Sequence, residues 1–230
     1  MLEARIVKLR RDLIVDVAIH LPDRSSIGLF GASGVGKSSV LSCIAGFEEP
    51  DEGFVCLDRL QLFPPSLPLW LRPIGYMTQD ANLFPHLTVA QNVRFSVDGS
   101  RLDARWIDEL RERLELEPIW TAPAARVSGG QARRVALARM LARRPALVLL
   151  DEPFAGLDRH VVRSLLYDLR TWQARLGFSM IVVDHQVHIL ERLCARALVI
   201  EAGQVVQTGS WEELRRAPKT PLLARLLEPL

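Results

Sequence analysis

The chain has 230 residues, of which 49% are hydrophobic, and its 29 basic residues nearly balance 27 acidic ones. A chain of this length buries a large core, so we expect one domain, or one domain with an inserted lobe. The net charge of +2 gives no sign of the lopsided basic surface typical of nucleic-acid binders, and the three cysteines show no spacing that suggests disulfides or zinc. No apolar run approaches the roughly 18 residues of a membrane span, and the N-terminal residues show no signal-peptide core, so we expect a soluble, cytoplasmic protein.

The first third of the chain predicts strands around one helix. Residues 13–20 alternate apolar and polar side chains, which is typical of a half-buried strand. "SIGLF", residues 26–30, is a short buried strand that ends at a glycine-rich loop. The helix that follows over residues 37–45 stops at Gly46. Further β segments are expected over residues 53–63 and 72–79.

The middle of the chain predicts helices. Thr88-x-x-Gln91 is a capping-box pattern, and residues 103–116 carry apolar side chains at helical spacing. No strand pattern occurs between Gln79 and Arg144. We therefore expect a helical lobe here.

Buried strands return in the last third. We expect strands over residues 146–151 and 179–184, a helix between them that ends at Gly177, and a hairpin over residues 197–209. Buried strands that alternate with helices predict an α/β fold with a mostly parallel sheet.

The glycine-rich loop carries the strongest chemical signal. "GASGVGKS", Gly31 to Ser38, matches G-x-x-x-x-G-K-[ST] between a strand and a helix, and an ordinary turn needs neither Lys37 nor Ser38. Successive backbone N–H groups and the helix N-terminus favour phosphate. Lys37 is expected to reach the β- and γ-phosphates of a nucleotide, and Ser38 to ligate Mg²⁺. We predict nucleotide contacts from Gly31, Ser33, Gly34, Gly36, Lys37, Ser38 and Ser39.

"LVLLDEP" supplies a second part of the site. Asp151 follows four apolar residues, so its carboxylate emerges at the carboxyl end of a buried strand, where ligands bind in open α/β sheets. That position suits a Mg²⁺ ligand, and Glu152 beside it is suited to take a proton from an attacking water. An isolated Asp-Glu pair is more often a solvated turn, but the loop at Gly31–Ser38 favours the catalytic interpretation.

Two more polar residues are expected at this edge of the sheet. His185 follows "MIVVD"; a lone histidine is more often structural, but its place beside Asp151 favours a γ-phosphate contact. Gln79 ends another predicted strand, and its amide is expected to touch Mg²⁺ or the attacking water.

The segment "VSGGQARRVALARM" raises a question about two glycines. Ser128 and Gln131 form a capping box for the helix that follows. Gly129 and Gly130 nevertheless lie in the first turn, where each costs a helix about 1 kcal/mol relative to alanine. A simple capping box leaves both glycines unexplained.

Together these motifs resemble the ATP-binding subunits of ABC transporters along nearly the whole chain. "GASGVGKSS" resembles the Walker A motif, "VSGGQ" the signature, "LVLLDEP" the Walker B motif and "AGLD" the D-loop, while Gln79 resembles the Q-loop residue and His185 the switch histidine. The resemblance implies an α/β P-loop (RecA-like) core with an antiparallel β subdomain and an inserted helical lobe. The corresponding division is residues 1–79 and 145–215 for the core with the β subdomain, 80–144 for the lobe and 216–230 for a C-terminal tail.

The resemblance also implies how the glycines are used. In this family two subunits pair head to tail around two ATP molecules, and the signature of one subunit binds the γ-phosphate held by the P-loop of the other. Bare backbone at the helix start then admits a partner's nucleotide. The residues expected to serve it are Ser128, Gly129, Gly130 and Gln131.

The implied cofactors are ATP and Mg²⁺, with Ser38, Gln79 and Asp151 as metal ligands and Glu152, His185 and Gln79 as catalytic residues. The implied partners are a second ATPase subunit, most simply an identical one, integral membrane permease subunits and, indirectly, a solute-binding protein. No nucleic acid is expected, and the place implied is the cytoplasmic face of the cell membrane.

Three features depart from the family pattern. The signature opens with Val127 instead of leucine, and His185 lies between Asp184 and Gln186, which leaves its orienting partners open. No aromatic residue precedes Phe30 to stack on adenine. Arg10 or Arg11 is an alternative residue for stacking on adenine, although we favour a place for both in a solvent-exposed hairpin.

The transported solute is predicted from local similarity. "RPIGYMTQDANLFPHLTVAQNVRFSV" resembles importers of molybdate, sulfate, thiamine and polyamines. "AIHLPDRSSIGLFGASG" is most similar to molybdate-type subunits, whereas "LFPHLTVAQNV" also suits thiamine-type ones. Molybdate or a related oxyanion is therefore favoured, with thiamine or another small solute as the alternative. Phe84 and Leu87 belong either to the lobe core or to a groove for a permease helix, and we favour the groove.

Two other classes of protein remain open at this point. A soluble ABC switch in DNA repair or translation usually carries two ATPase units or long coiled-coil insertions, and this chain has neither pattern. A P-loop kinase needs an acceptor pocket and has no use for "VSGGQ".

Overall fold

The computed structural model describes residues 1–95, 97 and 103–227. Its strands form one sheet in the order β5-β4-β1-β2-β10-β9-β3-β8-β7-β6. The strands are β1 (Leu2–Arg10), β2 (Leu13–Leu21), β3 (Ser26–Phe30), β4 (Glu52–Leu57), β5 (Leu60–Phe63), β6 (Ile74–Met77), β7 (Leu147–Asp151), β8 (Ser179–Val183), β9 (Arg196–Glu201) and β10 (Gln204–Ser210). The helices are α1 (Lys37–Ala45), α2 (Val89–Arg94), α3 (Ala104–Arg113), α4 (Gly129–Ala142), α5 (Arg159–Leu176), α6 (Val187–Leu193), α7 (Trp211–Arg216) and α8 (Pro221–Leu227).

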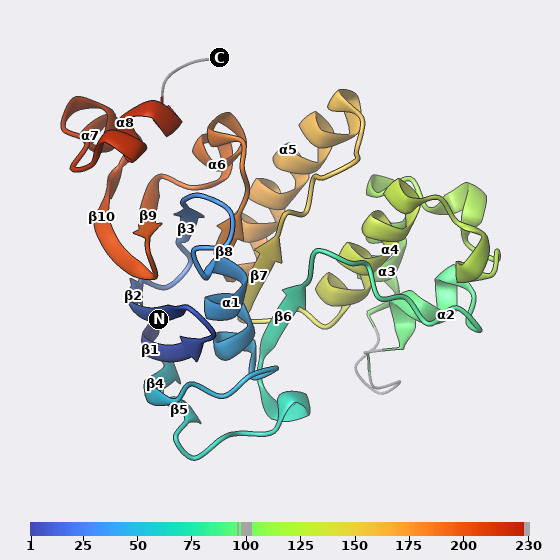
Figure 1. The fold of residues 1–230 in the computed structure, drawn as a ribbon. Helices are drawn as coiled ribbons and strands as arrows, with labels where there is room; N and C mark the ends of the chain where they lie inside the picture. The colour runs from blue at the N-terminus through green and yellow to red at the C-terminus, as the bar shows by residue number, and fades with distance from the viewer. Residues whose placement is uncertain (96, 98–102, 228–230) are drawn as a thin grey trace.

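The sheet has a parallel part and an antiparallel part. Strands β9, β3, β8, β7 and β6 run parallel to one another in that order. Strands β2, β1, β4 and β5 pair antiparallel at the other end of the sheet (Figure 1). The predicted α/β class, with a parallel core and an antiparallel β part, is confirmed.

The parallel strands are buried on both faces, which explains their continuous apolar runs. In β7, Leu147 and Leu149 pack in the cluster that includes α1, whereas Val148 and Leu150 pack in the cluster of α5, α6 and the helical lobe. Helix α1 therefore covers one face, and α5 and α6 cover the other (Figure 1).

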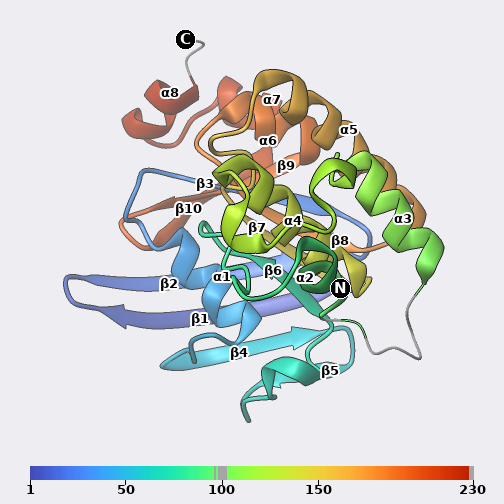
Figure 2. The same ribbon diagram turned by 90° about the vertical axis from the view of Figure 1, so that its right-hand side faces the viewer.

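Helices α2, α3 and α4 form the predicted helical lobe beyond β6 (Figures 1 and 2). The Thr88–Gln91 capping box starts α2, and the Asp103 side chain caps α3 by accepting from the Trp106 N–H at 3.2 Å. On α3, Glu109 accepts hydrogen bonds from Trp172 Nε1 and Arg175 Nη2 of α5, both at 2.8 Å. These contacts fix the lobe against the core.

The domain division at 79/80, 144/145 and 215/216 stays a prediction. Position 96 and positions 98–102 of the lobe, and the last three positions of the tail, lie outside the described residues. Among the described residues, no helix has the length and hydropathy needed to cross a bilayer.

The structure also departs from the predicted elements. Residues 2–10 form β1, which the sequence analysis missed, and the single β segment expected over residues 53–63 is two strands, β4 and β5. Strand β6 ends at Met77, so Gln79 lies two residues beyond the strand that it was expected to end. Its side chain contacts Glu152, the residue that follows β7, as described below.

Candidate active site

The loop between β3 and α1, Gly31–Ser38, is hereafter the phosphate loop. Gly31 has φ 151° and Gly36 has φ 101°. A Cβ atom on Gly31 would lie 2.2 Å from the Ile200 carbonyl oxygen, and one on Gly36 would lie 2.5 Å from a Val15 methyl carbon. These glycines are therefore required by the loop's own packing and conformation.

Lys37 opens α1 and is 6% exposed. Its Nζ donates hydrogen bonds to the carbonyl oxygens of Gly31 at 2.9 Å and Ala32 at 2.8 Å. Burial lowers the pKa of this ammonium, while the charges of Glu152 and Asp151 act in the opposite direction. The loop thus holds a cation at its centre, where phosphate oxygens would bind.

Asp151 lies at the end of β7 and is 4% exposed. Burial raises the pKa of its carboxyl group, and a hydrogen bond with the Ser38 side chain opposes that shift. The hydroxyl and the carboxylate predicted to hold Mg²⁺ are therefore adjacent. Hard oxygen donors suit this ion, which keeps several waters and takes other ligands from substrate phosphates.

Within the part of the chain that is described, no group of three or more His, Cys, Asp or Glu side chains is arranged to hold a metal unaided. The Ser38, Asp151 and Gln79 set thus fits a Mg²⁺ ion that is shared with a nucleotide, rather than a closed structural metal site.

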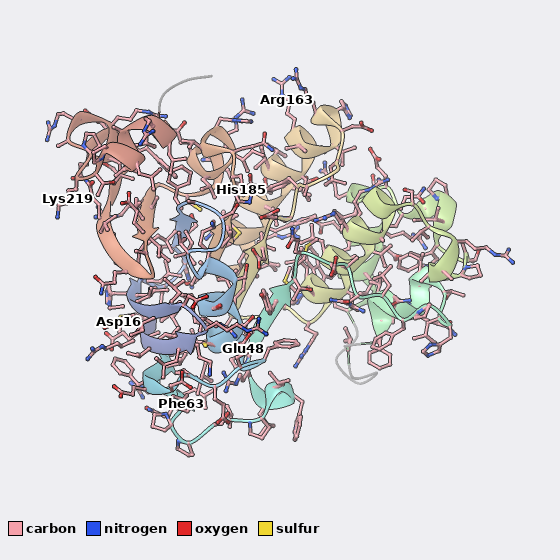
Figure 3. All side chains as sticks on the ribbon, viewed as in Figure 1. Asp16, Glu48, Phe63, Arg163, His185 and Lys219 are labelled. Carbon is pink, nitrogen blue, oxygen red and sulfur yellow. The ribbon has the colours of Figure 1, made fainter. Side chains whose placement is uncertain are left out.

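Glu152 brings the three predicted catalytic residues together. Its Oε1 lies 2.5 Å from His185 Nε2, and its Oε2 accepts a long hydrogen bond from Gln79 Nε2 at 3.4 Å. The backbone at Glu152 has φ 50°, in the left-handed region, and its N–H donates to the Val183 carbonyl at 2.9 Å. The carboxylate is thereby turned toward the ends of the neighbouring strands, where the exposed His185 follows β8 (Figure 3).

A cavity of about 390 Å³ separates this carboxylate from the phosphate loop. It is lined by Ser33, Gly34, Gly36, Lys37, Ser38, Ser39, Gln79, Glu152, Val183 and His185. The predicted P-loop contacts thus share one cavity with the predicted catalytic residues, except Gly31, which does not line it.

The signature residues lie elsewhere. None of Ser128, Gly129, Gly130 and Gln131 lines this cavity. The predicted capping box is present: Ser128 Oγ accepts from the Gln131 N–H at 3.3 Å, and Gln131 Oε1 accepts from the Ser128 N–H at 2.9 Å. Neither glycine has a positive φ, and a Cβ atom on Gly129 would meet nothing within 4 Å. The chain's own structure therefore gives no reason for Gly129.

The open questions around His185 and Arg10 have structural answers. Asp184 is buried and accepts a hydrogen bond from the Gln186 N–H at 2.8 Å, and His185 contacts Glu152. Arg10 donates to Ser39 Oγ at 3.0 Å and forms an ion pair with Glu48. The sequence analysis missed this contact, because residues 29 and 38 positions apart carry no local signal of pairing.

The comparisons with known proteins agree with this geometry. The model of the family "ABC transporter" matches residues 14–155. A probable sulfate/thiosulfate import ATP-binding protein CysA from Chlorella vulgaris is 35% identical over 92% of this chain and 90% of its own length. A molybdenum import ATP-binding protein ModC from Rhodobacter capsulatus is 33% identical over 98% of this chain and 63% of its own. An Fe(3+) ions import ATP-binding protein FbpC 2 from Pectobacterium atrosepticum is 38% identical over 94% of this chain and 64% of its own.

Among solved structures, the dimeric post-hydrolysis state of the ATP-binding cassette MJ0796 bound to ADP and Pi superposes with a TM-score of 0.79. It is 25% identical and covers 91% of this chain and 98% of that one. The fold and site are those of an ATP-hydrolysing cassette. The chain belongs to the ABC transporter family and is an ATPase. It spans less than two thirds of the length of the ModC and FbpC relatives, but most of the CysA relative.

Proposed function

We propose that this chain hydrolyses MgATP to power solute import through a membrane permease, at the cytoplasmic face of the membrane. The observation that carries the proposal is the Glu152 carboxylate, which faces the phosphate loop across one cavity together with His185 and Gln79. The three relatives, each described as an import ATP-binding protein, support the transport part.

The proposed chemistry follows from the positions of the side chains. Lys37 and the loop N–H groups would hold the phosphates, and Ser38, Asp151 and Gln79 would hold Mg²⁺, whose charge would offset the negative charge on the phosphate oxygens. Water attacks the γ-phosphorus and gives a proton to Glu152. The bond from the γ-phosphorus to the bridging oxygen then breaks, and its electron pair leaves with ADP. His185 contacts the γ-phosphate and orients the glutamate.

The active form is proposed to be a head-to-tail homodimer with two composite sites. Ser128 and Gly129 are exposed at the start of α4, and open space surrounds Gly129 where a side chain would be. The dimeric MJ0796 cassette supports this assembly. The ATP on one phosphate loop would then be completed by Ser128, Gly129, Gly130 and Gln131 of the other subunit.

A groove between the core and the helical lobe is the proposed docking site for a permease helix. It encloses about 530 Å³ and is lined by Phe47, Trp70, Phe84 and Phe95, among others. Three of these are strongly exposed: Phe47 at 63%, Trp70 at 74% and Phe95 at 61%. Clustered exposed aromatic side chains are typical of protein interfaces. Thr78 lines the groove and directly precedes Gln79, which connects it to the ATP site.

Substituting Phe84 with Asp tests this docking site. Phe84 is half-buried and packs on Phe95 with ring centroids 4.3 Å apart, so its loss should weaken the groove more than the lobe core. Phe84→Asp is expected to release the permease in co-purification while the soluble ATPase activity and the melting temperature persist. A variant that unfolds would instead favour the lobe-core interpretation.

The proposed solute is molybdate or a related oxyanion, delivered by a solute-binding protein. The sulfate/thiosulfate and molybdenum relatives support an oxyanion, while the Fe(3+) relative and the thiamine-type segment keep another small solute as the alternative. Uptake of labelled molybdate, sulfate and thiamine by cells with and without this gene distinguishes them. Loss of thiamine uptake alone would overturn the oxyanion proposal.

The function as a whole is tested by phosphate release from MgATP and by fractionation. The chain should release phosphate with no acceptor substrate and should co-purify with membranes. Recovery with ribosomes or DNA, and not with membranes, would favour a non-transport switch.

A further inference from the structure

An arginine on the signature helix reaches the catalytic glutamate of its own chain. Arg133 lies in the second turn of α4, and its Nη1 donates a hydrogen bond to the Glu152 backbone carbonyl oxygen at 3.0 Å. The same carbonyl accepts a longer bond from the Ala155 N–H at 3.3 Å. Arg133 is therefore a direct link between α4 and the end of β7.

This link acts on a strained residue. Glu152 has φ 50°, a conformation that is unfavourable for a non-glycine residue and persists only when its surroundings hold it. The Val183 carbonyl holds the Glu152 N–H from one side, and Arg133 holds its carbonyl from the other. A guanidinium makes a charge-assisted bond of fixed geometry, so it restrains the backbone that sets the direction of the carboxylate.

A second contact joins the same two segments. A Cβ atom on Gly130 would lie 3.3 Å from Leu157 Cδ2 and 3.7 Å from the Gly156 carbonyl oxygen. The first turn of α4 therefore packs on residues 156–157, a few positions after Glu152. A displacement of the helix start must move both this segment and the guanidinium.

We propose that Arg133 is a positioning residue that couples the signature helix to the general base of the same subunit. The inference rests on the proposed function, in which the start of α4 contacts the partner's ATP while Glu152 serves the ATP on its own phosphate loop. Binding of ATP in one composite site then sets the backbone of the base in the other. The Arg133–Glu152 contact lies within each chain. It connects the two composite ATP sites, each of which needs residues from both subunits.

Removal of the Arg133 hydrogen-bond donor tests the first part of the proposal, that Arg133 positions Glu152. Arg133→Met keeps the aliphatic stem and loses the hydrogen bond, whereas Arg133→Lys keeps a cationic donor. We expect Arg133→Met to lower kcat about tenfold, the effect typical of one lost bond to a charged donor, with the Kd for ATP unchanged. Arg133→Lys should recover part of this loss.

Arg134→Met is the matched control. Arg134 also donates to a carbonyl, that of Leu114 at 2.9 Å, and it pairs with Glu115, but both contacts lie within the helical lobe. It should lower the melting temperature without the selective loss in kcat. An equal loss of kcat in both variants would mean that damage to α4, and not the Glu152 contact, is responsible.

A double-mutant cycle with Glu152→Gln is the decisive experiment. If Arg133 acts through the carboxylate, Arg133→Met should change the residual rate of Glu152→Gln by less than about twofold. The same tenfold loss in both backgrounds would overturn the inference and leave the proposed function intact. A wild-type chain that binds ATP yet releases no phosphate would instead remove the proposed function, and the inference with it.

Discussion

Two glycine-rich segments of this chain differ in what their glycines do. In the phosphate loop, Gly31 and Gly36 have left-handed φ values, and any side chain on them would collide with the chain's own atoms. At the start of α4, Gly129 has an ordinary conformation and nothing within 4 Å of the missing Cβ atom. The structure of one chain explains the glycines of the first segment, whereas it gives no reason for Gly129 in the second, which we propose serves another molecule.

The same contrast holds for the polar groups. Lys37, Asp151 and Glu152 all have partners within their own chain. The Ser128 side chain accepts a hydrogen bond from the Gln131 N–H that it caps, and it lies exposed at the helix start. Substitutions test whether the phosphate loop depends on its own chain and the start of α4 on another molecule.

The largest effect is expected at Glu152. Glu152→Gln keeps the shape of the side chain and removes its basicity, so hydrolysis should fall by about 10²–10⁴-fold, the range typical of general-base loss. Binding of MgATP should persist, and the ATP-bound dimer should accumulate, which size-exclusion chromatography with ATP measures. Turnover close to that of the wild type would exclude Glu152 as the base.

A paired substitution compares the two glycines directly. Gly31→Ala should destabilise the fold by roughly 1–3 kcal/mol, because it forces a strained conformation and a clash with the Ile200 carbonyl. Gly129→Ala should stabilise it by about 0.4–1 kcal/mol, because alanine suits a helix better. Urea unfolding of the nucleotide-free chain measures both. If Gly129→Ala costs as much stability as Gly31→Ala, the helix start is built for its own chain.

The smallest effect concerns the base of the nucleotide. No Phe, Tyr or Trp side chain is among the described residues that line the cavity beside the phosphate loop, and Arg10 is held by Ser39 and Glu48. Affinity should come from the phosphates and Mg²⁺, so the Kd values for ATP and GTP should differ by less than about tenfold, or 1.4 kcal/mol. A hundredfold preference for ATP would reveal a base-reading residue outside this cavity.

Local signals predicted much of this structure from sequence. The Thr88 and Ser128 capping boxes, the start of α1 at Lys37 and its end at Gly46 all depend on residues within one helical turn, and all are present. The strand β1 was missed, although the buried Leu2, Ala4 and Ile6 alternate with exposed charged residues in the pattern of a half-buried strand.

Contacts between distant segments were not predictable in the same way. The motifs brought Glu152, His185 and Gln79 to one sheet edge, but their mutual contacts depend on the left-handed φ of Glu152 and on Thr78, the residue that separates Gln79 from β6. Nothing in the sequence distinguishes Arg133 from the other arginines of the same helix. Its bond to the Glu152 carbonyl arises only from the packing of α4 beside β7.

The central claim is that the start of α4 serves the ATP of a second subunit. Gly129→Asp tests it most cleanly, because the new side chain has open space in its own chain and places a carboxylate where a partner's γ-phosphate would bind. The isolated variant should still bind ATP through Lys37 but should hydrolyse it poorly. Lys37→Ala should also be inactive, because it lacks the ammonium that we propose binds the phosphates.

The decisive measurement is the ATPase rate of a mixture of Gly129→Asp and Lys37→Ala chains, after subunit exchange has been verified with two affinity tags. In a mixed dimer, one composite site carries both defects, while the other joins an intact phosphate loop to an intact signature helix. The account predicts that the mixture hydrolyses ATP faster than either variant alone. A mixture no faster than its components, or a folded Gly129→Asp monomer that cannot bind ATP, would contradict it.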